Sequence, residues 1–417
     1  MRILMISNEY PPHIYGGAGV HVNYLCRELV RSGGAEHRLQ VMCFGEQRET
    51  GPNFDVTGVP GMPELFSGQG PHNKVSEVLG RNVAMTALAG DADIVHCHTW
   101  YTYLAGCLLK QFLDAPLVTT VHSLEPMRPW KQEQVGKGYH VSSWLEKTAL
   151  ENADGVIAVS QGMQADIMRI YDVAPEKIRV IYNGIDAGCY RKQLDPDVLV
   201  SFGINRHKPY VIFVGRVTRQ KGIIHLIHAL PYIEEGVQIV LCAGAPDTEA
   251  IAREMSAEVE RAQAGTSNEI IWIPEMVPPE RLVVLLSHAA LFICPSIYEP
   301  FGITNLEAMA CSIPVVAAAV GGIPEVVLHG QTGSLIPFEP VSDADPEPRR
   351  PDQYTRDLAA AINELLRAPE RRQAMGAAGR RRVEAHFGWE AIARQTLQYY
   401  AELRAARLDR KNRKGVH

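Results

Sequence analysis

Short apolar runs, rich in β-branched residues, alternate along the first half of the chain with longer stretches in which apolar residues recur every three or four positions. The short runs predict strands and the longer stretches predict helices. The strands are expected at 2–7, 38–44, 94–98, 117–122, 156–160 and 178–182, and the helices at 20–31, 76–89, 100–113, 141–152 and 161–171. This alternation is typical of a parallel sheet covered by helices.

The same pattern restarts after residue 200, and a polar, turn-rich stretch at 186–209 predicts a linker before it. Strands are expected at 210–214, 238–243, 269–273, 291–295, 314–318 and 334–336, and helices at 221–234, 248–263, 279–288, 303–311, 354–367, 369–386 and 389–408. We therefore predict an α/β protein of two doubly wound Rossmann-like domains, residues 1–195 and 206–385. The last helix, 389–410, is expected to pack back on the first domain.

The composition is that of an ordinary globular protein, because 46% of the 417 residues are hydrophobic and 21% are charged. The net charge of −6 gives no general attraction to nucleic acid. Eight cysteines without a C-x-x-C pair indicate free thiols in a reducing compartment. We find no secretory signal and no membrane span, so we expect a cytoplasmic protein. Its basic tail, around Arg407, Arg410 and Lys411, is interpreted as a solvated helix end.

Open parallel sheets bind ligands beyond the carboxyl ends of their strands, so two such domains are expected to face one another across a cleft. The first candidate site, Gly16-Gly17-Ala18-Gly19, follows the first strand and opens a helix. The backbone N–H groups of Gly17, Ala18 and Gly19 can approach an anion there. A tight turn that binds nothing is the alternative.

Two cations follow the first strand of the second domain. Arg216 lies at the carboxyl end of that strand, and Lys221 lies near the start of the next helix. A guanidinium and an ammonium group at such a place suit a diphosphate. The alternative is a pair of ordinary surface cations.

The segment 295–310 carries the strongest signal. A buried strand ends in a loop that holds Glu299, and Gly302, Ile303 and Thr304 then open a helix whose free N–H groups can bind phosphate. Glu307 lies about one turn into this helix, where its carboxylate can accept hydrogen bonds from ribose hydroxyls. The alternative, a helix cap beside a solvated glutamate, leaves the rest of the string unexplained.

Histidines and acidic residues offer further candidates in the first domain. His122 ends an apolar strand and is expected to point at the cleft, although a purely structural histidine is equally compatible with the pattern. His96 and His98 share one face of a strand, but we see no third ligand near them and predict no metal site. Asp91 and Asp93 lie at the opposite end of that strand and are interpreted as a turn.

Together these motifs resemble the retaining glycosyltransferases of family 4, which have the GT-B fold. The resemblance is carried by Glu299 to Glu307 with Pro300-Phe301-Gly302, by Gly215-Arg216 with Lys221-Gly222, by Asn183-Gly184-Ile185-Asp186 and by Gly321-Gly322-Ile323-Pro324-Glu325. The opening, from Asn8-Glu9-Tyr10-Pro11-Pro12 to Gly19-Val20-His21, is similar to the actinobacterial-type glycogen synthases. That group uses ADP-glucose and includes the maltose-1-phosphate-forming enzymes.

The resemblance implies a role for each candidate residue. Arg216 and Lys221 would hold the donor diphosphate, Gly302, Ile303 and Thr304 would add N–H donors, and Glu307 would bind the ribose. Glu299 and His122 would contact the transferred sugar, and Gly17, Ala18 and Gly19 would lie beside the phosphates. The family needs no metal and no cofactor, because the nucleotide sugar is a substrate. Retention is explained by front-face attack, in which the leaving phosphate oxygen takes the acceptor's proton.

One departure bears on the subgroup. Bacterial glycogen and starch synthases carry K-x-G-G-L near the N-terminus, whereas this chain has Ile14-Tyr15-Gly16-Gly17-Ala18 without the lysine. The predicted function is transfer of glucose from ADP-glucose to a glucan end or to glucose-1-phosphate. The alternative is a family 4 enzyme that uses another nucleotide sugar and a lipid or small-molecule acceptor. An oxidoreductase or epimerase is disfavoured because no suitable G-x-G-x-x-G loop is present.

Overall fold

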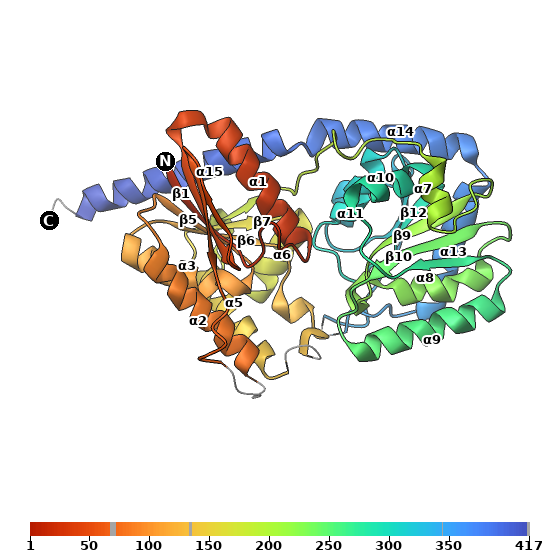
Figure 1. Ribbon diagram of the computed structural model, residues 1–417, viewed down its shortest axis with the longest axis horizontal. Helices are drawn as coiled ribbons and strands as arrows, with labels where there is room; N and C mark the ends of the chain where they lie inside the picture. Colours follow the sequence, from red (N-terminus) through yellow and green to blue (C-terminus); the bar gives the residue numbers. More distant parts are fainter. Residues whose placement is uncertain (67–71, 133–135, 344, 415–417) are drawn as a thin grey trace. The chain divides into compact units, whose positions relative to one another are not determined.

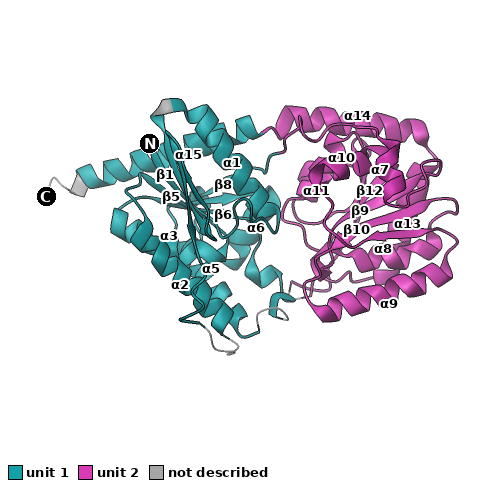
Figure 2. Cartoon of the chain, viewed as in Figure 1, with its two compact units in different colours: residues 1–184, 389–417 teal, residues 185–388 magenta. Residues whose placement is uncertain are grey.

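The computed structural model describes residues 1–66, 72–132, 136–343 and 345–414 (Figure 1). The chain forms two compact units, coloured separately in Figure 2. Unit 1 comprises Met1–Gly184 and Trp389–His417, and unit 2 comprises Ile185–Gly388. Each unit is an α/β domain built on its own largely parallel sheet, as the alternating pattern predicts.

The break between the units lies at Gly184, earlier than the predicted domain end at 195. Residues beyond it bind to unit 2, because Arg380 donates hydrogen bonds to the carbonyl oxygens of Tyr190 at 2.6 Å and Ala187 at 2.9 Å. The expected linker also contains a short helix, α7 (Pro196–Ser201), whose first turn is capped by the Asp195 side chain. Proline at the first helical position and an aspartate cap explain this helix.

Unit 1 contains a sheet in the order β3-β4-β2-β1-β5-β6-β7-β8, in which the pairs from β4 to β8 are parallel. Its strands are β1 (Arg2–Ile6), β2 (Arg38–Phe44), β3 (Arg48–Thr50), β4 (Phe54–Val59), β5 (Ile94–His98), β6 (Leu117–Val121), β7 (Gly155–Ala158) and β8 (Ile178–Val180). The antiparallel pair β3–β4 was not predicted, because β3 is fully exposed and polar and so carries no apolar pattern.

Helices cover this sheet, and the last one returns from the far end of the sequence. They are α1 (Gly17–Gly33), α2 (Asn73–Leu88), α3 (Tyr103–Leu113), α5 (Gly138–Asn152), α6 (Gln161–Ile170) and α15 (Trp389–Lys414), with short 3-10 turns η1 (Gly34–Glu36), η2 (Trp100–Thr102), η3 (Glu125–Met127) and η4 (Pro175–Lys177). Helix α15 packs against α1, and its Trp389 and Tyr400 join the core around Met5 and Leu25. This is the packing predicted for the last helix.

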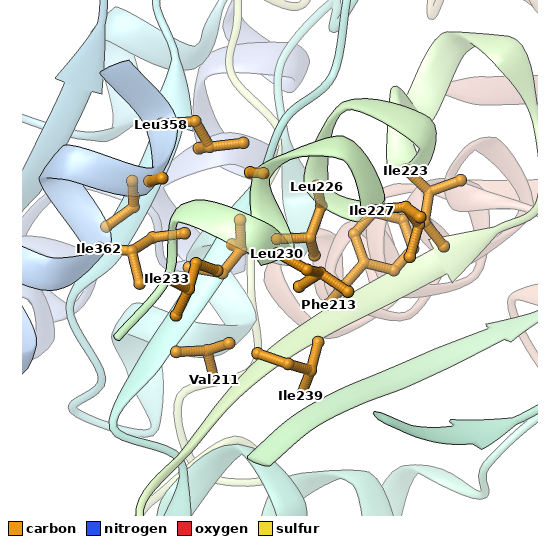
Figure 3. Packing of buried hydrophobic residues seen from close by; sticks show 14 of the residues in the cluster. Val211, Phe213, Ile223, Leu226, Ile227, Leu230, Ile233, Ile239, Leu358 and Ile362 are labelled. Atoms are coloured by element: carbon orange, nitrogen blue, oxygen red, sulfur yellow. The ribbon is translucent and has the colours of Figure 1, made fainter. Parts of the chain in front are cut away.

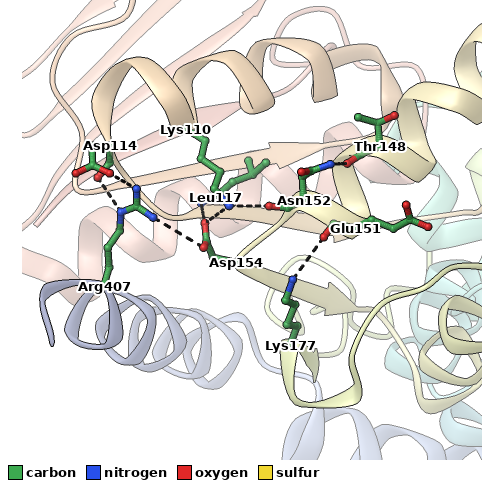
Figure 4. Close-up of polar contacts among 9 residues, drawn as sticks. All are labelled: Lys110, Asp114, Leu117, Thr148, Glu151, Asn152, Asp154, Lys177 and Arg407. Atoms are coloured by element: carbon green, nitrogen blue, oxygen red, sulfur yellow. Dashed lines mark hydrogen bonds and ion pairs between the residues drawn. The ribbon is translucent and has the colours of Figure 1, made fainter. Parts of the chain in front are cut away.

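The basic end of α15 is exposed and also carries ion pairs. Arg407 forms an ion pair with Asp114 and lies 4.0 Å from Asp154 (Figure 4). Lys411 also pairs with Asp114. Lys110 in turn contacts Asp154 at 2.9 Å. These pairs connect Arg407 and Lys411 to the loops beside β6 and β7. Arg410 and Lys411 remain exposed, which agrees with the interpretation of the tail as a solvated helix end.

Unit 2 contains a parallel sheet in the order β11-β10-β9-β12-β13-β14. The strands are β9 (Tyr210–Arg216), β10 (Gln238–Gly244), β11 (Ile270–Ile273), β12 (Leu291–Cys294), β13 (Val315–Ala318) and β14 (Gly333–Ile336). The helices are α7, α8 (Ile223–Ala229), α9 (Glu249–Gly265), α10 (Pro279–His288), α11 (Ile303–Ala310), α12 (Ile323–Val326), α13 (Pro351–Leu366) and α14 (Pro369–His386), with turns η5 (Arg219–Lys221) and η6 (Leu230–Tyr232).

Apolar side chains from these helices fill the space over the sheet of unit 2. Phe213 and Ile239 rise from β9 and β10 to meet Leu226 of α8 and Leu358 and Ile362 of α13 (Figure 3). This packing fixes β9, and with it the loop that follows Arg216. Among the described residues, no helix is both long and apolar enough to cross a membrane.

Candidate active site

The strand order places the candidate residues of unit 2 where an open sheet binds ligands. β9 lies between β10 and β12, so the connections from β9 and β12 leave in opposite directions along the sheet. The crevice beyond the carboxyl ends of such strands is the usual ligand site of this architecture. Arg216 ends β9, and Glu299 follows β12.

The structure brings Lys221 and Glu299 into direct contact. The Lys221 ammonium donates a hydrogen bond of 2.7 Å to Glu299 Oε2, and the two side chains are 21% and 8% exposed. Burial alone would lower the pKa of Lys221, but the charge and hydrogen bond of Glu299 outweigh it and raise that pKa. Lys221 is therefore a permanent cation, held beside a carboxylate in a largely water-excluded place.

Two glycines allow the loops around this pair to approach closely. Gly222 and Gly321 have positive φ angles of 59° and 52°. A Cβ atom on Gly222 would lie 2.1 Å from the Pro295 carbonyl oxygen, and one on Gly321 would lie 2.1 Å from the Glu299 carbonyl oxygen. The N–H of Gly322 also donates to that Glu299 oxygen at 2.9 Å. Glycine is thus required on both sides of the loop that carries Glu299.

Arg216 has a partner that the sequence did not reveal. Its Nη1 donates to Asp247 Oδ1 at 2.7 Å, and the Asp247 side chain is only 4% exposed. A charge-assisted bond of this kind restricts the guanidinium to few orientations. Asp247 follows β10, 31 residues from Arg216, so only the pairing of β9 with β10 brings the two together.

Helix α11 begins as predicted, with Gly302 as its N-terminal cap at φ 102° and Ile303 and Thr304 in its first turn. Glu307 lies one turn further along. Burial raises the pKa of Glu307 to about 7, although a hydrogen bond from Tyr190 and the charge of Lys221 act in the opposite direction. Glu307 therefore changes its charge close to neutral pH.

In unit 1, the glycine-rich loop is bound by an acidic side chain. Glu9 Oε2 accepts hydrogen bonds of 2.8 Å from the backbone N–H groups of Tyr15 and Gly16. A Cβ atom on Gly19 would lie 2.6 Å from the same oxygen. Glu9 therefore shapes the loop, and Gly17, Ala18 and Gly19 form the first turn of α1, where N–H groups have no partner within the helix.

His122 belongs to a cluster of histidines rather than standing alone. His98 Nδ1 lies 2.9 Å from His122 Nε2, and the rings of His21 and His122 are 4.8 Å apart. His96 is bonded separately to Tyr400 and Thr120. The expectation that no further ligand lies near His96 and His98 is therefore wrong, because α1 and β6 bring two more imidazoles beside β5.

The cluster is neutral, because His21 and His98 are buried and His122 is only partly exposed. Burial lowers the pKa of His21 to about 4 and holds the pKa values of His98 and His122 well below the usual value. Within the described parts of the chain, His21, His98 and His122 are the residues that could hold a metal ion, since their ligand atoms all lie within 4.8 Å of one another.

The two acidic residues that we interpreted as a turn are used structurally. Asp93 Oδ2 accepts a hydrogen bond of 2.8 Å from the backbone N–H of Arg2, and Asp91 pairs with the Arg2 side chain at 3.0 Å. They fix the amino end of β1, opposite to the end at which His122 lies.

Two family models match the chain, one in each half. The model described as Glycosyltransferase Family 4 matches residues 15–188, and the one described as Glycosyl transferases group 1 matches residues 197–346. The chain is 44% identical over 414 residues to the alpha-maltose-1-phosphate synthase of Mycolicibacterium smegmatis, covering 97% of this chain and 100% of that protein. It is 30% identical to a glycogen synthase of Mycobacterium tuberculosis, covering 96% and 94% of the two chains.

The fold is shared with solved glycosyltransferase structures. The sucrose-phosphate synthase from Thermosynechococcus elongatus superposes with a TM-score of 0.77 at 27% identity, covering 97% of this chain and 99% of that one. Its match extends over both units. The chain thus belongs to glycosyltransferase family 4, and it is a glycosyltransferase with the GT-B fold.

Proposed function

We propose that the protein transfers glucose from ADP-glucose to glucose-1-phosphate with retention of configuration, which yields maltose-1-phosphate and ADP. The observation that carries this proposal is the 44% identity, over nearly the whole chain, to an alpha-maltose-1-phosphate synthase. The lower identity to a glycogen synthase, 30%, makes a glucan end the second acceptor to test. ADP-glucose is the donor used by the group of synthases that the N-terminal motif resembles.

The arrangement in unit 2 supports a site for the donor diphosphate. Arg216 is oriented by Asp247, and Lys221 is held by Glu299. As the bond between the glucosyl C1 and the diphosphate oxygen breaks, negative charge grows on the leaving ADP. Fixed cations and the N–H groups of Gly302, Ile303 and Thr304 stabilise that charge without reorganising.

The remaining residues are assigned to the nucleoside, the sugar and the acceptor chemistry. Glu307 accepts from the ribose hydroxyls, and Glu299 and His122 contact the transferred glucose. The acceptor hydroxyl attacks C1 on the face that ADP leaves, and its proton passes to the departing phosphate oxygen. Gly17, Ala18 and Gly19 add backbone donors for the phosphates. The reaction uses no metal and no cofactor.

The test is a panel of donors and acceptors. The purified protein is mixed with ADP-glucose, UDP-glucose or GDP-mannose, each with glucose-1-phosphate or glycogen, in the presence of EDTA. We expect release of ADP only from ADP-glucose, and chiefly with glucose-1-phosphate. Turnover of another nucleotide sugar alone would instead favour a family 4 enzyme with a lipid or small-molecule acceptor.

A further inference from the structure

A methionine and two histidines form a chain of polar contacts across three neighbouring strands. Met5 on β1 places its Sδ atom 3.0 Å from His98 Nε2, at the end of β5. His98 Nδ1 then lies 2.9 Å from Nε2 of His122, which directly follows β6. Met5 and His98 are completely buried.

The Met5 thioether, at one end of this series of contacts, decides which ring nitrogens of His98 and His122 carry a proton. A methionine sulfur carries no hydrogen and can only accept, so His98 must donate from Nε2. His98 is completely buried, where a charged imidazole is disfavoured, so it is neutral and carries one ring proton. Its Nδ1 is then an acceptor, and His122 Nε2 must carry the hydrogen between them.

The other tautomer of His98, with its proton on Nδ1, would be energetically unfavourable. If His98 donated from Nδ1 to His122, its Nε2 lone pair would face the lone pairs of the Met5 sulfur in a place without water. A buried acceptor without a donor is disfavoured. Of the other imidazoles that pack against His98, His96 is bonded to Tyr400 and Thr120, and the His21 ring lies at 72° to the His122 ring with their centroids 4.8 Å apart.

A neutral imidazole that donates from Nε2 has its lone pair on the second nitrogen, which is Nδ1 in His122. Among the residues that the structure describes, we find no hydrogen-bond partner for this nitrogen. His122 is partly exposed, whereas His21 and His98 are buried. Nδ1 is therefore the part of this network that remains for a substrate.

We propose that Met5 and His98 are positioning residues that fix the Nε2–H tautomer of His122, so that His122 Nδ1 accepts a hydrogen bond from a hydroxyl of the transferred sugar. The sugar half of this statement rests on the proposed function, whereas the tautomer is a property of the protein alone. It follows that the sugar hydroxyl in contact with His122 must donate the hydrogen bond.

The tautomer is measured without substrate, by nitrogen NMR of the full-length protein labelled at histidine, with the His122 signals assigned from a His122→Asn variant. We expect a protonated Nε2 and an unprotonated Nδ1 at His122. In Met5→Leu, which removes the acceptor, both His98 and His122 should sample two tautomers. Met42→Leu, a substitution at another fully buried methionine of the same sheet, should leave the signals unchanged.

Two results would overturn the inference. One is a proton on Nδ1 of His122 in the unchanged protein. The other is an identical tautomer in Met5→Leu, shown to be folded by its thermal melt, because Met5 would then have no part in setting it. Neither result depends on which donor or acceptor the enzyme uses.

The sugar contact is tested with donor analogues in which one glucose hydroxyl at a time is replaced by hydrogen or by fluorine. Fluorine cannot donate, so at the contacted position both analogues should lose about tenfold in kcat/KM, and the loss should disappear in His122→Phe, whose side chain has no acceptor. A fluorine analogue that keeps full activity at every position where the deoxy analogue fails would show that His122 donates. In Met5→Leu we expect KM for the donor to rise more than kcat falls.

Discussion

Lys221 and Glu299 illustrate how single residues combine two tasks in this site. While no substrate is bound, each side chain neutralises the charge of the other, because an unpaired charge that is largely shielded from water destabilises the folded protein. When a diphosphate enters, the same ammonium gains a second anion. The pair therefore stabilises the fold and prepares the site, and these effects can be separated by substitution.

We predict that Lys221→Met lowers kcat at least about a hundredfold and destabilises the protein by about 3 kcal/mol, because it leaves Glu299 buried without its cation. The double variant Lys221→Met/Glu299→Gln should regain most of the stability but none of the activity. Steady-state kinetics and thermal melts measure the two effects. Arg219→Ala is the matched control, since Arg219 lies on the same turn with a well exposed side chain. Normal turnover in Lys221→Met would contradict the assignment.

Glu307 should make nucleotide binding depend on pH. Its pKa of about 7 lies above that of an ordinary glutamate because the side chain is buried, so it is ionised only above neutral pH. A carboxylate accepts hydrogen bonds from ribose more strongly than a carboxylic acid does. We expect the Kd for ADP, measured by calorimetry, to rise several-fold as the pH falls through 7.

The diphosphate of ADP itself also titrates, and Glu307→Gln isolates that contribution. In this variant binding should be weaker at high pH, and only the dependence caused by the ligand should remain. Identical pH profiles for the two proteins would mean that Glu307 does not contact the nucleotide.

At the scale of elements, the position of the loop after β12 depends on the backbone at Gly321, which packs closely against it. Gly321, ahead of α12, touches the Glu299 carbonyl oxygen so closely that a side chain cannot fit. The position of Glu299 is therefore set by main-chain packing as well as by its ion pair with Lys221.

We predict that Gly321→Ala both destabilises the protein and removes activity, because the methyl group would push the Glu299 loop outward. Gly330→Ala is the matched control. Gly330 also has a positive φ, 75°, but a Cβ atom there would meet nothing within 4 Å. The control should cost only the backbone strain, about 1 kcal/mol, and keep its activity. Equal losses in melting temperature and kcat for the two variants would argue against the close approach.

A second pair of elements, η3 and α5, is joined through two buried glutamates, Glu125 of η3 and Glu146 of α5. Glu146 Oε1 accepts from the Glu125 N–H at 2.8 Å and from the Tyr171 hydroxyl at 2.6 Å. Burial and the nearby Glu125 charge raise the pKa of Glu146. The folded protein therefore retains a proton that the unfolded chain releases once the pH exceeds the usual range of a glutamate.

It follows that the contribution of Glu146 to folding stability should fall as the pH rises from the ordinary glutamate pKa toward the raised one, by up to about 1.4 kcal/mol per pH unit. Glu307, whose pKa is also raised, adds to this fall, and the buried histidines, whose pKa values are lowered, oppose it, so the contribution is read against a variant. The free energy of unfolding of the unchanged protein relative to Glu146→Gln should therefore fall over this pH range, whereas relative to Glu176→Gln, at an exposed glutamate of η4, it should stay constant. Urea unfolding at a series of pH values measures the slope. Identical pH dependences in Glu146→Gln and the unchanged protein would show that Glu146 makes no such contribution.

The sequence predicts much of this architecture because its signals are local. Helices α10 and α14 occur at the predicted residues, since apolar periodicity and the prolines at their first positions are read from neighbours. Glu299, Gly302 and Glu307 are likewise predicted as site residues from one short string. The sequence does not reveal Asp247 as the partner of Arg216, or Met5 and His98 as neighbours of His122, because the order of the strands in the sheet decides which side chains come into contact. His96 and Tyr400, for example, are in contact although 304 positions separate them in the sequence.

At the scale of the whole molecule, the residues assigned to the proposed reaction are divided between two units. Arg216, Lys221, Glu299 and Glu307 belong to unit 2, whereas His122 and the glycine-rich loop belong to unit 1. The chain passes between the units at Gly184 and again before Trp389, where α15 returns to the core of unit 1. The proposed transfer therefore requires the full chain, including its last helix.

The most direct test of this account is to identify the product formed from ADP-glucose and glucose-1-phosphate by proton and phosphorus NMR, with EDTA present. We predict a disaccharide phosphate with a new α-glucosidic linkage, formed in equal amount to ADP. A product with inverted configuration would contradict the proposed function. So would the absence of a disaccharide phosphate when the same enzyme preparation turns over another nucleotide sugar.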